Sequence, residues 1–401
     1  MASNPSFPNV TYAGEHYAET FGPAVIDPAG LIDLGLATPI DNAKFKGTVN
    51  EMDDTVVFQN PNPIFTDQNT QATMPEINLE ATPYEVHKLI RWDDVRKSWF
   101  SGQLGAGSLN DYNASQLTDQ FIQKVYIPKV KLANANLLLR GKSGLPAAIG
   151  SYTFSAGYTG LYARIEAATG TNKIAATIGQ IAVSAVANGT TTTVTVANGA
   201  AADVEIGNVV SIRGAAGTGW TSMNGDHVVL DKTATSVVIA FDSDALTNGN
   251  YTASSAAIQF INRNNIIGVM AQVLSRVPIA VQRDPSVKIV LPSNLALEWQ
   301  FANAAVQQNG GGYFLTSYQM QFIDKAVVIL DQAPDNTIGI WTPNRVFNIF
   351  DLESDTSNAS LIWMGDTTND HVYRLRFGIK SGVNITTAFQ NEITLYRPFK
   401  A

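Results

Sequence analysis

The sequence contains no cysteine, which excludes disulfides, thiolate metal ligands and cysteine nucleophiles. It has no stretch approaching the roughly 20 apolar residues that a membrane-spanning helix needs. The first residues also lack the positive segment and apolar run of a secretory signal. We therefore expect a protein that is made and kept in a cytoplasm and that contacts no membrane.

Charged residues are few, at 15% of the 401 residues, and acidic ones outnumber basic ones by 34 to 26, which gives a formal charge of −8. Sequence-nonspecific binding to nucleic acid relies on lysine and arginine against phosphate. An acidic chain is therefore a poor candidate for such binding. The 45% hydrophobic content is ample for a buried core, and the length suggests two or three domains.

Motifs for catalysis are also missing. None of the four histidines belongs to a His-x-x-x-His or His-Glu-x-x-His arrangement. They are His16, His87, His227 and His371. No Gly-x-Ser-x-Gly nucleophile elbow occurs. The adjacent acidic pairs Asp53-Asp54 and Asp93-Asp94 are expected to cap helices or face solvent. We therefore predict no catalytic, cofactor-binding or metal-binding residue, no cofactor, and no enzyme activity.

The run Gly141-Lys142-Ser143 resembles the end of a phosphate-binding loop. That motif needs a glycine where Asn136 stands and a strand before the loop, whereas a helix is expected here. We interpret the run as the glycine-rich end of a helix.

That helix is the long element predicted over residues 114–139. Apolar residues recur at helical spacing, at Leu117, Phe121, Val125, Pro128, Leu132, Ala135 and Leu139. Polar residues lie between them, including Lys124, Lys129, Lys131 and Asn134. The pattern predicts one dry and one wet face. Pro128 removes a backbone hydrogen bond, so we expect a kink near Lys124.

Before this helix the chain is irregular and then strand-rich. Residues 1–36 are interrupted by proline and glycine but carry apolar side chains, so they predict an arm that lies on its own domain or on a neighbouring copy. Residues 37–83 predict a long β-hairpin with strands at 45–49 and 55–58. An isolated two-stranded hairpin is marginal in water, so something outside should hold it. A strand at 84–90 and a helix at 92–100 follow.

Residues 172–262 have a different texture, with short strands expected at 181–186, 190–196, 204–212, 227–230, 236–241 and 251–260. Several are separated by Asn-Gly pairs, which favour hairpins. From 175 to 262 there are two basic and six acidic residues, a net charge of 2 − 6 = −4. This predicts an all-β, water-facing module inserted into a host domain.

Helix–strand–helix texture returns after the insert. A helix is expected from Ile266 to Val277, a strand at 287–291, a helix opened by Pro292-Ser293, and a strand at 326–330. Strict alternation from Tyr373 to Lys380 predicts a half-buried strand, and a last strand contains Ile393 and Leu395.

In its order of elements the chain resembles the major capsid proteins of tailed bacteriophages, the Hong-Kong-97-like fold. The runs Ile206–Ile212 and Met223–Val229 are also similar to small β-barrel modules of phage structural proteins. The resemblance implies an α+β fold. Its parts would be an N-terminal arm (1–36), an extended loop (37–83), a peripheral domain (84–171 and 361–401) with spine helix 114–139, an all-β insertion domain (172–262) and an axial domain (263–360).

The function implied by this resemblance is self-assembly into hexamers and pentamers that form an icosahedral shell around phage DNA. The protein would belong to the virion and assemble in the bacterial cytoplasm. Its partners would be other copies of itself, scaffold, portal and cement or decoration proteins, with weak non-specific contact to packaged DNA. Some relatives cross-link a loop lysine to an asparagine, but no spacing supports such a pairing of Lys44 or Lys46 with Asn384.

Two alternatives belong to other classes. A tail-tube or other tail structural protein would share the β-rich insert and self-assembly, but it leaves the long helix unexplained. A carbohydrate-binding protein or enzyme could use Trp220, Tyr251 and acidic residues of the insert, although no carboxylate pair is evident. We further expect the insert to lie on the outer surface of the shell, with the loop 214–219 accessible.

Overall fold

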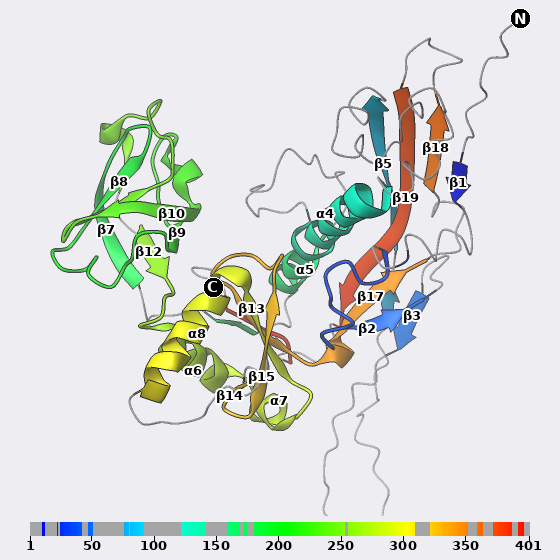
Figure 1. Ribbon diagram of the computed structural model, residues 1–401. Coiled ribbons are helices and arrows are strands. Elements are labelled where there is room, and N and C mark those ends of the chain that lie inside the picture. The colour runs from blue at the N-terminus through cyan, green and yellow to red at the C-terminus, as the bar shows by residue number, and fades with distance from the viewer. Residues whose placement is uncertain are drawn as a thin grey trace, which may run out of the picture. The chain divides into compact units, whose positions relative to one another are not determined.

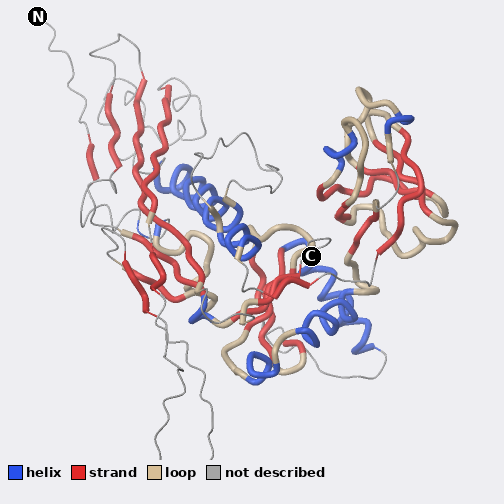
Figure 2. The backbone as a smooth tube through the Cα atoms, turned by 180° about the vertical axis from the view of Figure 1, so that it is seen from behind, coloured by secondary structure: helices blue, strands red, loops and turns tan. Residues whose placement is uncertain are grey.

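The computed structural model describes residues 10–12, 22, 25–41, 47–50, 76–79, 81–91, 122–141, 159–168, 172–174, 180–252, 256–308, 321–351, 359–363, 372–386 and 392–396 (Figure 1). The chain forms two compact units, each built from segments far apart in sequence. The first holds Met1–Lys142, Phe154–Leu161 and Val346–Ala388, and the second holds the remainder. Helices and sheets occur together, as the α+β prediction requires (Figure 2).

A sheet organised around one long strand forms the first unit. The 14-residue strand β19 pairs with β5 on one side and with β18 and β17 on the other, and β1 and β2 extend the sheet beyond these. The bounds are β1 Val10–Tyr12, β2 Thr38–Ile40, β5 Thr82–Arg91, β17 Val346–Phe350, β18 Ala359–Trp363 and β19 Val372–Ile385. Leu375, Phe377 and Ile379 are buried while Arg374 and Arg376 are exposed, so the predicted alternation is confirmed from 374 to 377, whereas Gly378, expected on the wet face, is buried.

The predicted hairpin is formed by a two-stranded sheet of β3 (Gly47–Asn50) and β4 (Glu76–Leu79). The strand expected at 55–58 lies outside the described residues, and the partner of β3 is β4. Leu79 is 1% exposed and belongs to a cluster with Phe347 and Ile349 of β17. The base of the hairpin is therefore anchored in the core of its own unit.

The described part of the N-terminal arm lies on its own chain. Val25, Leu31 and Leu36 are fully buried, and Asn348 Nδ2 donates a 2.7 Å hydrogen bond to the carbonyl oxygen of Ile26. The arm was expected to lie on its own domain or on a neighbouring copy, and residues 25–37 lie on their own unit.

The long helix is α4 (Ile127–Arg140), preceded by a π-helical turn η3 (Ile122–Tyr126); residues 114–121 lie outside the described ones. Pro128 falls in the first turn of α4, where a missing backbone N–H costs nothing. The helix is irregular near Lys124, where a kink was expected, but the irregularity is a change from π to α geometry before the proline and is not a hydrogen bond lost at Pro128. Gly141, at φ +55°, ends the helix, and its N–H bonds Leu137 O at 3.0 Å, as predicted for a glycine-rich end.

The predicted dry face of this helix is wrong in two places. Pro128 is exposed and Leu132 is 42% exposed, whereas Asn134, expected in solvent, is only 2% exposed. The buried face instead follows Tyr126, Val130 and Asn134. Asn134 is buried because its side chain meets the Ser381 hydroxyl of β19, which donates to Asn134 Oδ1 at 3.5 Å. The helical period was predicted correctly, and Ala135 and Leu139 of the predicted dry face are buried, but Pro128 and Leu132 are not.

A closed barrel forms the middle of the chain, in the strand order β10-β11-β8-β7-β12-β9. The strands are β7 Gln180–Ala187, β8 Thr192–Val196, β9 Val209–Arg213, β10 Gly225–Lys232, β11 Ser236–Ile239 and β12 Ala257–Phe260, with short 3-10 turns η4 Trp220–Met223 and η5 Asn248–Asn250. The strand expected at 204–212 is shorter, because Gly207 turns the chain at φ +88°. The strand expected at 251–260 likewise begins only at Ala257.

The rest of the second unit is a mixed six-stranded sheet in the order β14-β15-β13-β16-β20-β6. Its strands are β6 Asn172–Ile174, β13 Lys288–Pro292, β14 Gln321–Phe322, β15 Lys325–Leu330, β16 Ile338–Trp341 and β20 Thr394–Tyr396. The remaining helices are α5 Leu161–Ala167, α6 Ile266–Arg276, α7 Ile279–Arg283, α8 Ser293–Gln308 and the 3-10 turn η6 Pro343–Arg345. The predicted helix–strand–helix layer is α6, β13 and α8.

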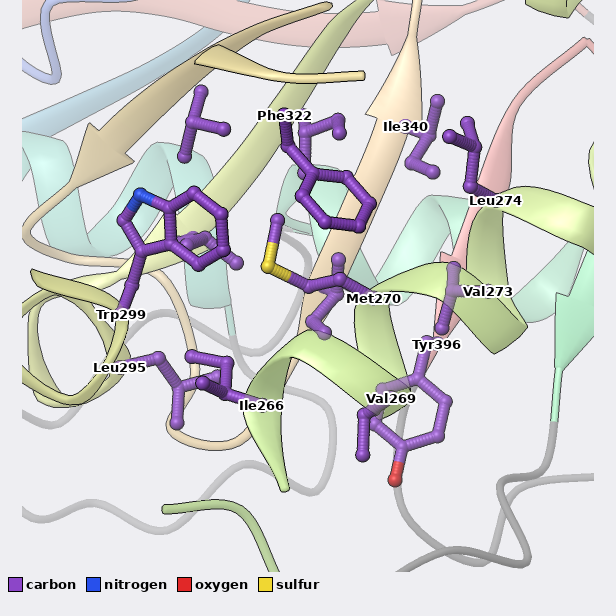
Figure 3. Packing of buried hydrophobic residues seen from close by; sticks show 14 of the residues in the cluster. Ile266, Val269, Met270, Val273, Leu274, Leu295, Trp299, Phe322, Ile340 and Tyr396 are labelled. Atoms are coloured by element: carbon purple, nitrogen blue, oxygen red, sulfur yellow. The ribbon is translucent and has the colours of Figure 1, made fainter. Parts of the chain in front are cut away.

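The core of this layer lies between its helices and the sheet (Figure 3). Trp299 of α8 meets Phe322 of β14 edge to face, with ring centres 5.5 Å apart, and Met270 of α6 lies beside both. Aromatic pairs of this geometry add to the free energy gained by burying apolar area.

The expected boundary at 360/361 differs from the pairing of the strands. β17 pairs with β19 in the first unit although it precedes residue 361, and β20 pairs with β16 in the second unit although it follows it. β6 pairs in parallel with β20, so residues 172–174 lie in this sheet and not in the barrel. Backbone hydrogen bonding between distant segments decides these places, and local sequence pattern does not show it.

Candidate functional site

The residues weighed for chemistry are not brought together. His87 lies on β5, His227 lies on β10, and His16 and His371 lie outside the described residues, as do Asp53-Asp54, Asp93-Asp94 and Lys142-Ser143. Within the described ranges no group of three or more His, Asp or Glu side chains could hold a metal ion. None of the described helices is long and apolar enough to cross a membrane.

The cross-linking residues are placed only in part. Lys44 and Lys46 lie outside the described residues. Asn384 lies in β19 opposite Phe347, and its Oδ1 accepts a 2.9 Å bond from the N–H of Ile385. A covalent bond to a lysine of another copy therefore stays unsupported.

The aromatic pair considered for sugar binding is part of the barrel core. Trp220 is 0% exposed, its Nε1 donates to Thr247 O at 3.0 Å, and its ring meets Tyr251 edge to face at 5.7 Å. Burial raises the pKa of the Tyr251 hydroxyl. A ring that stacks on a sugar must present its face to solvent, so this pair does not support the carbohydrate alternative.

The surface with the clearest unused binding capacity is the free side of β5, called here the β5 edge. β5 has ten residues and pairs with β19 along its whole length, but within the described residues it has no partner on its other side. An unpaired strand edge presents a row of free N–H and C=O groups to another chain. Leu89 of this strand is 65% exposed, so an apolar side chain accompanies the free backbone.

Charged side chains surround Leu89 on the exposed face of β5 and β19. Arg376 binds the Glu85 carboxylate through Nε at 3.1 Å and through a second bond from Nη2. His87 Nε2 lies 3.0 Å from the same carboxylate, and Arg374 Nη2 lies 3.5 Å from His87 Nδ1. The hydrogen bond from Arg376 is the main cause that lowers the pKa of Glu85. Charged side chains on an edge strand discourage pairing with arbitrary strands of other chains. The edge can then pair only with a partner whose charges are complementary.

The sequence already contained part of this site. The strand at 84–90 and the alternating strand from Tyr373 were both predicted, but their adjacency was not, because the two are nearly 300 residues apart. The ion pair of Glu85 with Arg376 and the exposure of Leu89 follow from that adjacency. Two sequence signals could have indicated an edge strand, namely Pro83 and the polar Glu85 and His87 within the strand.

Comparison with known proteins gives matches in structure but not in sequence. No protein family and no curated protein matches the sequence. Among solved structures, the chain is similar to the capsid of a native GTA particle, with 11% identity, a TM-score of 0.43, and coverage of 92% of this chain and 90% of that chain. It is similar to a chain of the satellite phage P4 procapsid, with 8% identity, a TM-score of 0.45 and coverage of 96% and 100%.

It is also similar to the cyanophage A-1(L) capsid, with 12% identity, a TM-score of 0.43 and coverage of 92% of both chains. These three solved structures are of phage capsids, a phage procapsid among them, and of a GTA particle. With TM-scores below 0.5, these likenesses do not carry the function, which has to be argued from the chain's own features.

Proposed function

We propose that this chain is the structural subunit of a virion shell, a major capsid protein that assembles with copies of itself around phage DNA. The observation that carries the proposal is the β5 edge, where ten residues of backbone pair on one side only within the described part of the chain and Leu89 is 65% exposed. The two-stranded sheet of β3 and β4 supports it, because two strands form little core of their own and the described anchor of this sheet is Leu79 at its base. In a closed shell each copy covers the exposed edges of the next.

Under this proposal the parts of the chain have separate roles. Residues 37–83 would be the extended loop that reaches a neighbour. Residues 114–139 would be the spine helix, of which α4 is the described end. The first unit, apart from the arm and the extended loop, would form the peripheral domain, and the six-stranded sheet of the second unit with its helices would form the axial domain around capsomer axes. Hexamers and pentamers would tile the shell, with scaffold, portal and cement or decoration proteins as further partners.

The assembly state tests the proposal directly. The purified chain would be passed through size exclusion with light scattering, and the heaviest fraction imaged in negative stain. Rings of five or six copies, or closed shells, are expected. Open tubes would favour the tail structural protein. A stable monomer at all concentrations would contradict both the capsid function and the tail function.

The barrel is proposed to lie on the outside of the shell. The loop 214–219 is a poor reporter for proteolysis, because Ala216 bridges Thr252 and Ala215 N–H bonds Asn224 Oδ1 at 2.9 Å. A better probe is Gly249→Cys. Gly249 is exposed, and nothing lies within 4 Å of an added Cβ. The new cysteine would carry the only thiol in the chain. Assembled particles should react with a bulky maleimide too large to pass through a shell. Reaction only after disassembly would place the barrel inside.

A further inference from the structure

The helix that includes α4 is the part of the described chain where positive charge is most one-sided. Residues 122–140 contain four basic residues and no acidic one, a net charge of +4 in a chain whose net charge is −8. Lys124, Lys129 and Lys131 are all exposed. A local concentration of one sign acts on a charged partner over about 8 Å at physiological salt, so the net charge of the chain does not cancel it.

The geometry of α4 makes these lysines available. Its buried side, with Val130 and Asn134, faces the sheet of its own unit, as the contact between Asn134 and Ser381 shows. Lys129 and Lys131 flank the exposed ridge of Pro128 and Leu132, and neither lysine has an ion-pair partner among the described residues.

We propose that this outward face, formed by Lys124, Lys129 and Lys131 and called here the α4 basic face, is the surface that contacts the phosphate backbone of the packaged DNA. The inference rests on the proposed capsid function and names the surface for its DNA contact. Flexible lysines without carboxylate partners bind phosphate as point charges and carry no base-specific geometry. Three of them give weak, salt-sensitive, sequence-independent contact, which suits a lining that must hold DNA and release it.

The chemistry of the face favours nucleic acid over another protein surface. A protein partner would have to supply carboxylates spaced to match lysines on both flanks of the ridge, whereas the duplex offers phosphate charges along its whole length. The acidic barrel, with a net charge of −4 over 175–262, offers such carboxylates on another copy. That pairing is the competing outcome of the test.

The test compares the full chain with Lys129→Gln/Lys131→Gln and with a charge-matched control, Arg276→Gln/Arg283→Gln, whose two arginines are exposed on α6 and α7. Binding to a short DNA duplex of random sequence is measured from about 50 to 200 mM salt. The slope of log K against log salt should fall by about one for each lysine removed, and the control should keep the wild-type slope. Assembly is measured on the same samples by light scattering.

The outcomes separate the inference from the proposed function. Unchanged DNA affinity and salt slope in the lysine variant would overturn the inference, whether or not shells form. Lost assembly with unchanged DNA binding would overturn it as well and assign the face to contact between copies. If the salt slope of DNA binding depends on the lysines but the chain never assembles, the α4 basic face is supported as an anion-binding surface and the capsid function is contradicted.

Discussion

Gly141 and Gly160 meet backbone to backbone at the end of α4. A Cβ added to Gly160 would lie 2.5 Å from Gly141 N and 2.7 Å from Leu139 O, and a Cβ on Gly141 would collide with the backbone of Gly160 in turn. Gly141 also needs its positive φ of +55° to end the helix. The glycines therefore allow the segment before α5 to cross directly over the end of α4.

Gly160→Ala should destabilise this crossing by about 1–3 kcal/mol, the usual cost of forcing extra atoms into a closely packed place. Hydrogen exchange should show faster opening of amides in residues 134–140. Gly249→Ala is the matched control, because nothing lies within 4 Å of the added Cβ. Equal exchange rates in the two variants would show that the backbone can move apart at no cost.

The long helix shows what could be predicted from sequence and what could not. Its period and its glycine end were read correctly, because both depend on residues near in sequence. Its packed face was predicted only in part: Ala135 and Leu139 are buried as expected, but the burial of Asn134 involves Ser381, which is far away in the sequence. Trp220 was considered a sugar-binding residue for the same reason, since sequence does not show that Tyr251 and Thr247 enclose it.

The barrel is joined to the α/β layer by a buried asparagine, whose removal should loosen it. Asn336 is 0% exposed, and its Nδ2 donates to Val209 O at 2.9 Å and to Ser211 Oγ at 3.1 Å. Asn336→Ala would leave the Val209 carbonyl buried without this donor, at a cost of about 1–3 kcal/mol. Exchange of the β9 amides should quicken.

Asn336 also has φ +56°, a conformation that costs a non-glycine residue about 1–2 kcal/mol. Asn336→Gly loses the same hydrogen bonds but tolerates this conformation. It should therefore be less damaging than Asn336→Ala. If the alanine and glycine variants exchange alike, backbone conformation contributes nothing at this position.

His227 should make the barrel sensitive to acid. Burial of its ring, which meets Phe241 edge to face, lowers its pKa below 6.5, and Arg213 adds to the shift. The 2.8 Å hydrogen bond to Met223 O and the charge of Asp226 oppose the shift without reversing it. The unfolded chain then binds the proton more readily than the folded one. Stability is therefore full above pH 6.5 and declines as the pH falls below it.

This pH dependence can be measured as the urea midpoint of barrel unfolding between pH 7.5 and 5.5. In His227→Gln the amide can still donate to Met223 O but does not titrate, so the decline should become shallower. His87→Gln serves as the control, because His87 is 45% exposed on β5. A decline of unchanged steepness in His227→Gln would assign it to the carboxylates instead.

The β5 edge provides the most direct test of assembly. Leu89→Asp places a carboxylate on an exposed strand position, so the fold of the subunit should survive, with an unchanged circular dichroism spectrum. Docking of a neighbour would take this carboxylate and Arg374, which lies opposite it in β19, out of water, and the cost of removing these charges from water should abolish particles in light scattering. Ile279→Asp makes the same change at a 66% exposed side chain of α7, away from any sheet edge. Shells formed equally well by both variants would show that the β5 edge stays open in the assembly, and the observation that carries the capsid proposal would be lost.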